Sequence, residues 1–285
     1  MIARQIFASE CSLAEGPLWD CRTNRLYWVD ILKGSIHSID PVDMSHRVHR
    51  SKDFVSCIVP KDGGGFIISA GTSLYAWDGD SGEVLISSIS EPPNNRFNDG
   101  KCDGSGRLWI GTMDIAEKSP SGNLYRFDRD RKFVKVASGF TVSNGIDWSP
   151  DDATMYHVDS PSGCVYSYDF EPSTGVLSNR QIFVKIPPEK GFPDGITVDS
   201  EGNLYVAHWG GSGVSVWNSE GKNIGFIEIP ALNVSSCSFG GPDLEDLYIT
   251  TAKNYDNRER ADTNGGGIFS IRTGAKGFRA NSFDW

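Results

Sequence analysis

The sequence predicts an all-β fold: a single six-bladed β-propeller of four-stranded antiparallel blades that spans residues 1–285. Three observations predict it. The chain of 285 residues contains 32 glycines, 14 prolines and 11% aromatic residues, which is typical of many short strands joined by tight turns. One strand motif recurs six times, and its copies are evenly spaced. All-β folds of this length form one domain, and no linker or charged block interrupts the chain.

The recurring motif is a turn rich in Asp, Gly or Asn, then a short apolar and aromatic strand, then a second strand. Equivalent positions of the first strand hold Tyr27, Ile67, Trp109, Tyr156, Tyr205 and Tyr248. Successive copies are 40, 42, 47, 49 and 43 residues apart, which matches the period of a four-stranded propeller blade. A short sheet with two apolar faces cannot bury both alone, so the blades are expected to stack around an axis. A β-sandwich with coincidental spacing is the alternative.

The elements follow in chain order. An N-terminal strand, Ile2–Phe7, is expected to complete the last blade, and Phe278–Trp285 is expected to form the C-terminal end of that blade. Between them, the two strands of each copy are predicted at Arg25–Asp30 with Gly34–Asp40, Gly65–Ile68 with Leu74–Asp78, Arg107–Gly111 with Gly122–Asp128, Thr154–His157 with Gly163–Asp169, Asn203–Val206 with Gly213–Asn218, and Asp246–Ile249 with Gly267–Ile271.

The overall charge restricts the partners of the protein. The formal net charge is −10, whereas nucleic-acid-binding domains are normally basic, so we expect neither nucleic acid nor an anionic membrane surface as a partner. Six cysteines are scattered singly, and the N-terminus lacks the apolar run of a signal peptide. These features predict a cytoplasmic protein with reduced thiols. A monomer and a small homo-oligomer both remain open.

Polar residues at equivalent places in several copies indicate a site. Glu15, Asn144 and Asp194 each precede a glycine and an apolar strand, and a fourth copy reads Arg96–Asp103. Repeat-equivalent positions are related by rotation about the propeller axis, so these side chains are expected to point at one another. Asx-Gly pairs are also ordinary turn formers, which is the alternative for each residue taken alone.

The donor atoms of this set predict the kind of metal. Two carboxylates and one amide oxygen suit Ca²⁺, Mg²⁺ or Mn²⁺, and tolerate Zn²⁺ or Fe²⁺ where water fills the remaining positions. No cluster of His or Cys is visible in the sequence, which argues against a structural zinc site. His37, His46 and His49 are expected at the surface, whereas His157 and His208 are expected to pack or to lie at the rim of the channel. A Gly-x-Ser-x-Gly nucleophile motif is missing.

The chain resembles the senescence-marker-protein/regucalcin/gluconolactonase family, six-bladed propellers that include bacterial sugar lactonases. The resemblance spans the whole chain. It rests on motifs that occur in the right order, namely Ala14–Pro17, Arg96–Lys101, Gly111–Met113, Ser143–Gly145, Ser149–Asp151, Pro193–Gly195, Trp209–Gly211, Phe239–Pro242 and Leu247–Ala252.

The resemblance implies one divalent metal ion bound by Glu15, Asn144 and Asp194, the three residues that the repeats also select. It implies metal-dependent hydrolysis of a small-molecule sugar lactone of the aldono type to the free sugar acid. The metal would polarise the lactone carbonyl and stabilise the oxyanion that develops as water attacks. Asp194 is the expected general base. An organophosphate or aryl-ester hydrolase and a non-catalytic calcium-binding propeller are the competing hypotheses.

The resemblance also implies a substrate site. Arg96 and Asn98 are expected to contact the sugar hydroxyls, and Asp99 to lie beside the substrate or at the edge of the metal shell. Some family members carry a substrate-contacting acidic residue three positions after Gly-Thr-Met, where this chain has Ala116. Two acidic residues lie nearby without aligning, Asp114 and Glu117.

Overall fold

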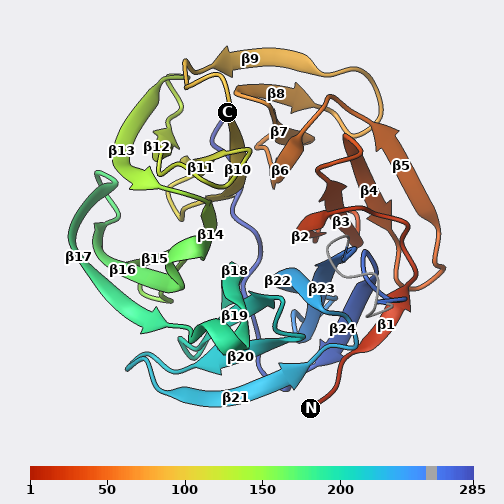
Figure 1. Ribbon diagram of the computed structural model, residues 1–285. Helices are drawn as coiled ribbons and strands as arrows, with labels where there is room; N and C mark the ends of the chain where they lie inside the picture. The colour runs from red at the N-terminus through yellow and green to blue at the C-terminus, as the bar shows by residue number, and fades with distance from the viewer. Residues whose placement is uncertain (255–261) are drawn as a thin grey trace.

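The computed structural model describes residues 1–254 and 262–285, and its strands form six four-stranded antiparallel sheets around a central axis (Figure 1). Each sheet is one blade, and its strands run in chain order from the axis to the outer edge, except in the last blade. The predicted all-β, six-bladed propeller is therefore confirmed. Within the described residues, no helix has both the length and the apolar composition needed to cross a membrane.

The first three blades are listed here from the innermost strand outward. Blade 1 contains β2 (Ala14–Asp20), β3 (Arg25–Asp30), β4 (Ser35–Ile39) and β5 (His46–Arg50). Blade 2 contains β6 (Val55–Pro60), β7 (Phe66–Ala70), β8 (Ser73–Trp77) and β9 (Val84–Ser88). Blade 3 contains β10 (Asn95–Cys102), β11 (Leu108–Asp114), β12 (Gly122–Phe127) and β13 (Phe133–Phe140).

The remaining blades repeat this arrangement, with two short 3₁₀ helices, η1 (Ser160–Ser162) and η2 (Pro188–Lys190), in their loops. Blade 4 contains β14 (Ser143–Trp148), β15 (Thr154–Asp159), β16 (Cys164–Glu171) and β17 (Val176–Lys185). Blade 5 contains β18 (Phe192–Val198), β19 (Leu204–Trp209), β20 (Gly213–Trp217) and β21 (Asn223–Glu228). Blade 6 contains β22 (Asn233–Gly240), β23 (Asp246–Ala252), β24 (Ile268–Arg272) and β1 (Arg4–Phe7).

The recurring sequence motif corresponds to the second and third strands of each blade. Side chains of these strands pack against the neighbouring blade, as where Tyr248 of β23 stacks on Trp19 of the innermost strand β2 with ring centroids 5.7 Å apart. Such contacts bury both faces of each sheet, which is why the blades need one another.

The N-terminal strand closes the ring as predicted. β1 pairs antiparallel with β24, with Arg4 opposite Ser270, so the first strand of the chain becomes the outer strand of the last blade. The prediction for the other end of the chain was wrong. Residues 278–285 do not extend blade 6 but cross beneath the propeller as an irregular segment toward blades 2 and 3 (Figure 1).

This C-terminal segment is anchored on the far side of the ring. The Phe283 amide donates to the Pro60 carbonyl at 2.8 Å, and the Asp62 amide donates to the Phe283 carbonyl at 3.0 Å. The Phe283 ring is fully buried and lies 5.4 Å from the Phe127 ring. The segment therefore ties the last blade to blades 2 and 3, and Ala280 and Asn281 line the cavity at this end of the channel.

We expect Phe283→Ala to lower the free energy of unfolding by about 3–5 kcal/mol, because it removes a fully buried ring and leaves a cavity. Urea denaturation followed by tryptophan fluorescence measures this change. Phe278→Ala is the matched control, since Phe278 is 50% exposed, and it should cost less than about 1 kcal/mol. Equal losses for the two variants would contradict the anchoring role of Phe283.

Candidate metal and active site

The innermost strands of the blades share a bulge near their starts. In blades 1, 3, 4 and 5 the pairing with the second strand skips two residues, and in blades 2 and 6 it skips one. A bulge re-aims side chains and is frequent beside functional sites. Asn98, Asn144 and Asp194 lie in these bulges, and Glu15 directly precedes one. The predicted residues thus lie within the innermost strands, whereas the sequence placed them just before a strand.

These residues surround a pocket of about 290 Å³ on the propeller axis. The pocket contains five of the six predicted site residues together with an additional acid and several apolar side chains. Its lining consists of Leu13, Glu15, Ile31, Arg96, Asn98, Met113, Glu117, Val142, Asn144, Ser160, Pro161, Phe192, Asp194 and Trp209. Its volume is at the lower end of small-molecule sites, which suits a ligand of monosaccharide size.

The three predicted metal ligands come together in this pocket. The Asn144 side-chain amide donates to Asp194 Oδ1 and, at 3.1 Å, to Ser160 Oγ. Both contacts use Nδ2, and Asn144 Oδ1 is buried without a hydrogen-bond partner. Glu15 Oε2 accepts the Gly16 amide at 2.9 Å. A buried carbonyl oxygen without a donor, beside two carboxylates, fits a hard divalent cation.

The glycines that follow the predicted ligands allow the innermost strands to approach one another. A Cβ at Gly145 would lie 2.7 Å from the Asp194 carbonyl oxygen, and one at Gly195 would lie within 2.5 Å of the Ser236 Cβ. Any larger residue would push blades 4, 5 and 6 apart. These glycines are therefore required by close packing around the axis as well as by the bulge itself.

Burial of several carboxylates in one place alters their protonation. Desolvation, reinforced by the charge of Asp99, raises the pKa of Glu15 to about 8. Desolvation and the charge of Glu15 raise the pKa of Asp194 well above its usual range. Asp99 has its pKa raised to about 6, again mainly by burial. Mutual repulsion of this kind disappears when a divalent cation lies between the carboxylates, so the electrostatics also fit a cation.

Arg96 and Asn98 form the polar wall of the pocket. Arg96 Nη1 donates to Asn98 Oδ1 and to the Phe97 carbonyl, both at 2.8 Å, and Asn98 Nδ2 donates to the Ser143 carbonyl at 2.9 Å. These contacts fix both side chains. Arg96 is 6% exposed, and its Nε is buried without a partner. Burial lowers the pKa of the guanidinium to about 10, which leaves it charged at neutral pH.

Asp99, predicted beside the substrate or at the edge of the metal shell, is not among the residues that line this pocket. It follows Asn98 within the bulge of β10. It lines the next cavity along the channel, with Gly16, Cys57 and Cys237. Its carboxylate accepts the Gly100 amide at 2.7 Å. Its charge still reaches Glu15 and Asp194, so it lies behind the predicted metal ligands.

Glu117 is the site residue that the sequence prediction missed. It lies at the exposed end of the turn that follows β11, with φ of +56°, and its amide donates to the Asp114 carbonyl at 2.9 Å. The turn brings its carboxylate to the pocket opposite Arg96, whose pKa its charge raises. The family motif places the acidic residue three positions after Gly-Thr-Met, which is Ala116 in this chain. The sequence contains no signal that the following turn would bring Glu117 to the pocket instead.

The remainder of the pocket is apolar. Phe192 is 43% exposed, and Trp209 is partly exposed beside it. Leu13, Met113 and Val142 contribute further apolar surface. Trp209 lines the pocket together with these side chains. Polar and apolar walls that face each other favour a ligand with both hydroxylated and apolar surface.

Fold and pocket together define a six-bladed β-propeller with a carboxylate- and amide-lined site at one end of its channel. The chain belongs to the SMP-30/gluconolactonase/LRE-like family, whose model matches residues 13–253. The resemblance inferred from the sequence motifs is thereby confirmed.

Relatives of the chain match it over most of its length. The putative sugar lactone lactonase YvrE of Bacillus subtilis (strain 168) is 37% identical over 276 residues, which is 95% of this chain and 94% of that protein. The pentonolactonase XacC of Haloferax volcanii is 34% identical over 254 residues, 88% of this chain and 86% of that protein. A solved structure of the calcium-binding protein regucalcin from Agrobacterium tumefaciens has a TM-score of 0.94 at 26% identity. The match covers 99% of this chain and 97% of that chain.

The raised pKa of Glu15 predicts a pH-dependent stability. Between pH 4.5 and about 8 the native state retains a proton that the unfolded chain has released, so the native state loses stability as the pH rises. We expect the Tm of chelator-treated protein to fall across this range, and Glu15→Gln to make the fall shallower. Thermal unfolding at several pH values measures both slopes. Identical slopes for wild type and variant would contradict the burial of an ionisable Glu15.

Proposed function

We propose that this protein hydrolyses a sugar lactone of the aldono type to the free sugar acid, with one divalent cation bound by Glu15, Asn144 and Asp194. The observation that carries the proposal is the partnerless Asn144 Oδ1, in a pocket whose lining also includes the buried carboxylates of Glu15 and Asp194 and the Arg96–Asn98 pair. The names of relatives, a sugar lactone lactonase and a pentonolactonase, support the same reaction.

Hydrolysis adds water across the ester bond of the ring. A cation held by the three ligands would withdraw electron density from the lactone carbonyl and stabilise the negative charge on its oxygen. Asp194 accepts a proton from the water as its oxygen bonds to the carbonyl carbon. The bond from that carbon to the ring oxygen then breaks, and the proton passes to the ring oxygen, which becomes a hydroxyl. The product is the open-chain acid.

The remaining pocket residues orient the substrate. Arg96 and Asn98 are held by their mutual hydrogen bond, so they can address sugar hydroxyls with little loss of conformational freedom. Glu117 faces Arg96 from the rim and can accept hydrogen bonds from the same hydroxyls. Trp209 and Phe192 can cover the apolar C–H face of the ring. Arg96 is the one cation of the pocket lining, so we propose an uncharged lactone.

Two other functions are tested by the same experiment. The apolar wall favours an aryl-ester or organophosphate substrate, and the calcium-binding relative favours a non-catalytic calcium propeller. Aldonolactones, an aryl ester and an organophosphate are each incubated with Ca²⁺, Mg²⁺, Mn²⁺, Zn²⁺, Fe²⁺ or EDTA. The proposal predicts aldonolactone turnover that EDTA abolishes and one metal restores. Turnover of only the aryl ester or the organophosphate would instead select the second hydrolase function. Metal binding without turnover of any substrate would select the non-catalytic calcium propeller.

We expect Asp194→Asn to lower kcat/KM by about 10²–10⁴-fold, because the amide cannot accept the proton. Steady-state lactone hydrolysis with a pH indicator measures the loss. Asp99→Asn is the matched control: it removes the neighbouring buried carboxylate behind the metal ligands, and metal binding should persist. If Asp99→Asn were as inactive as Asp194→Asn while still binding metal, Asp99 would be the proton acceptor and our assignment would be wrong.

We expect Glu117→Gln to raise KM by about 10-fold with kcat nearly unchanged, since a hydrogen bond to a charged group contributes about 1.5–3 kcal/mol and rim exposure reduces that. Lys118→Ala, an exposed neighbour in the same turn, is the control and should leave both constants as in wild type. A fall in kcat without a change in KM would show that Glu117 takes part in the chemical step rather than in binding.

A further inference from the structure

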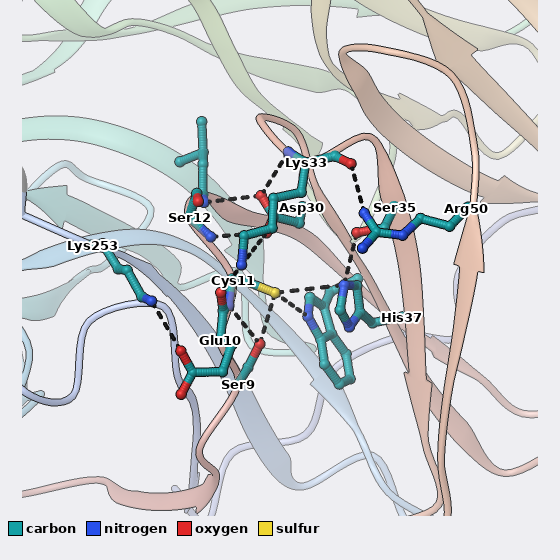
Figure 2. Close-up of polar contacts among 12 residues, drawn as sticks. Ser9, Glu10, Cys11, Ser12, Asp30, Lys33, Ser35, His37, Arg50 and Lys253 are labelled. Atoms are coloured by element: carbon teal, nitrogen blue, oxygen red, sulfur yellow. Dashed lines mark hydrogen bonds and ion pairs between the residues drawn. The ribbon is translucent and has the colours of Figure 1, made fainter.

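A second group of potential metal ligands lies in blade 1, apart from the pocket. Cys11 belongs to the connection between β1 and β2, Asp30 ends β3, and His37 lies on β4 (Figure 2). Their ligand atoms all lie within 4.8 Å of one another, with Cys11 Sγ 3.7 Å from His37 Nε2. Cys11 is 1% exposed and Asp30 is fully buried. The sequence predicted neither a Cys–His cluster nor a half-buried position for His37, because the fold alone brings these residues together.

Comparison with blade 4 separates the structural part of this group from the rest. Asp30 accepts the amides of Ser12 and Leu13 at 2.8 and 3.2 Å. Asp159 of blade 4 accepts the amides of Thr141 and Val142 in the same manner, at 3.1 and 3.0 Å. The aspartate therefore holds the loop before the innermost strand in both blades. This requirement of the fold fixes the Asp30 carboxylate in place.

Cys11 and His37 have no such explanation. By the same register, their counterparts in blade 4 are Phe140 and Tyr166. The guanidinium of Arg180 lies over both rings, 5.1 and 3.8 Å from their centroids. An aromatic pair that fills the same space in blade 4 is thus replaced in blade 1 by one thiol and one imidazole. Both are metal ligands that face a fixed carboxylate.

The geometry and charge of the three groups suit a zinc-like ion. For tetrahedral Zn²⁺, bond lengths of about 2.3 Å to sulfur and about 2.0–2.1 Å to nitrogen place these two atoms about 3.6 Å apart. A thiolate and a carboxylate together neutralise a divalent charge. Burial raises the pKa of Cys11 to about 11, so the thiol keeps its proton until a metal displaces it. Burial also lowers the pKa of His37 to about 4, which leaves the imidazole neutral as ligation requires.

Further side chains hold these ligands in position. His37 Nδ1 lies 3.1 Å from His46 Nε2, a hydrogen bond that orients the ring with Nε2 toward Cys11. The Trp28 indole donates to Cys11 Sγ at 3.4 Å, and the Ser9 hydroxyl donates to it at 2.7 Å. Partners of this kind fix the direction of ligands in metal sites.

Two cations and one hydroxyl also face the group. Lys33 Nζ lies 4.0 Å from Asp30 Oδ2, and the Arg50 guanidinium is close enough to lower the pKa of His37. Both weaken the binding of a cation, and Lys33, whose side chain is 40% exposed, can turn toward solvent. Ser35 Oγ lies 3.0 Å from His37 Nε2, and a bound ion would replace this hydroxyl as the partner of Nε2.

We propose that Cys11, Asp30 and His37 bind one Zn²⁺-type ion, with water as the fourth ligand, independently of the carboxylate site on the axis. The ion connects three segments: the loop that follows the ring-closing strand β1, the end of β3, and β4. It therefore stabilises the seam where the first and last blades meet. The inference does not rest on lactone hydrolysis.

Co²⁺ is the probe, because a cobalt–thiolate bond produces a charge-transfer absorption that oxygen ligands lack. Chelator-treated, reduced protein is titrated with Co²⁺. We expect the band in wild type at one equivalent, its loss in Cys11→Ser, and at least 10-fold weaker binding in His37→Tyr, which introduces the residue found in blade 4. Cys21→Ser, at a half-buried thiol outside the group, and Glu15→Gln, in the axial site, should both keep the band.

Thermal unfolding supplies a second readout and shows that each variant folds. Zn²⁺ should raise the Tm of Glu15→Gln, whose axial site is impaired, but not that of the double variant Glu15→Gln/Cys11→Ser. If Cys11→Ser failed to fold, His37→Tyr would decide through its affinity for Co²⁺. No charge-transfer band in wild type, or an undiminished band in Cys11→Ser or His37→Tyr, would overturn the proposal.

Discussion

The bulges of the innermost strands are the constraint on which the pocket depends. A regular strand would pair Asn144 and Asp194 with the second strand of their own blades, whereas the skipped pairing releases them toward the axis. The bulge needs small residues because the innermost strands of adjacent blades nearly touch, as at Gly145 and Gly195. Six bulges at one level turn a packed ring of sheets into a ring of inward-facing polar groups.

Such a ring is costly to fold without a ligand. Carboxylates removed from water repel one another, which is why the pKa values of Glu15, Asp99 and Asp194 are all raised. Arg96 is the one cation of the pocket lining, and its side chain is already engaged with Asn98. A divalent cation, as we propose, would balance the remaining charge and give Asn144 Oδ1 a partner. The same features that destabilise the ligand-free site thus favour metal binding and, under our proposal, catalysis.

Sequence reasoning recovered what repeats and spacing encode. The blade period gave the fold, and equivalent positions gave residues that the structure brings into one pocket. It did not recover features set by three-dimensional packing. The place of Asp99 depends on the conformation of a bulge, and that of Glu117 on a turn with a left-handed residue. The crossing of Phe283 beneath the ring and the meeting of Cys11 with His37 depend on contacts between segments that no local pattern records.

The most direct test of the account is cation binding by Asn144→Leu, measured by isothermal titration calorimetry on chelator-treated protein. This variant keeps the size of the side chain and removes only the amide, so the propeller should persist by circular dichroism. Apart from the ion proposed in blade 1, the account predicts one divalent cation bound tightly at the axial site of wild type, and at least 10-fold weaker binding at that site in the variant. Unchanged affinity in a folded variant would contradict the claim that Asn144 Oδ1 is a ligand of the metal ion.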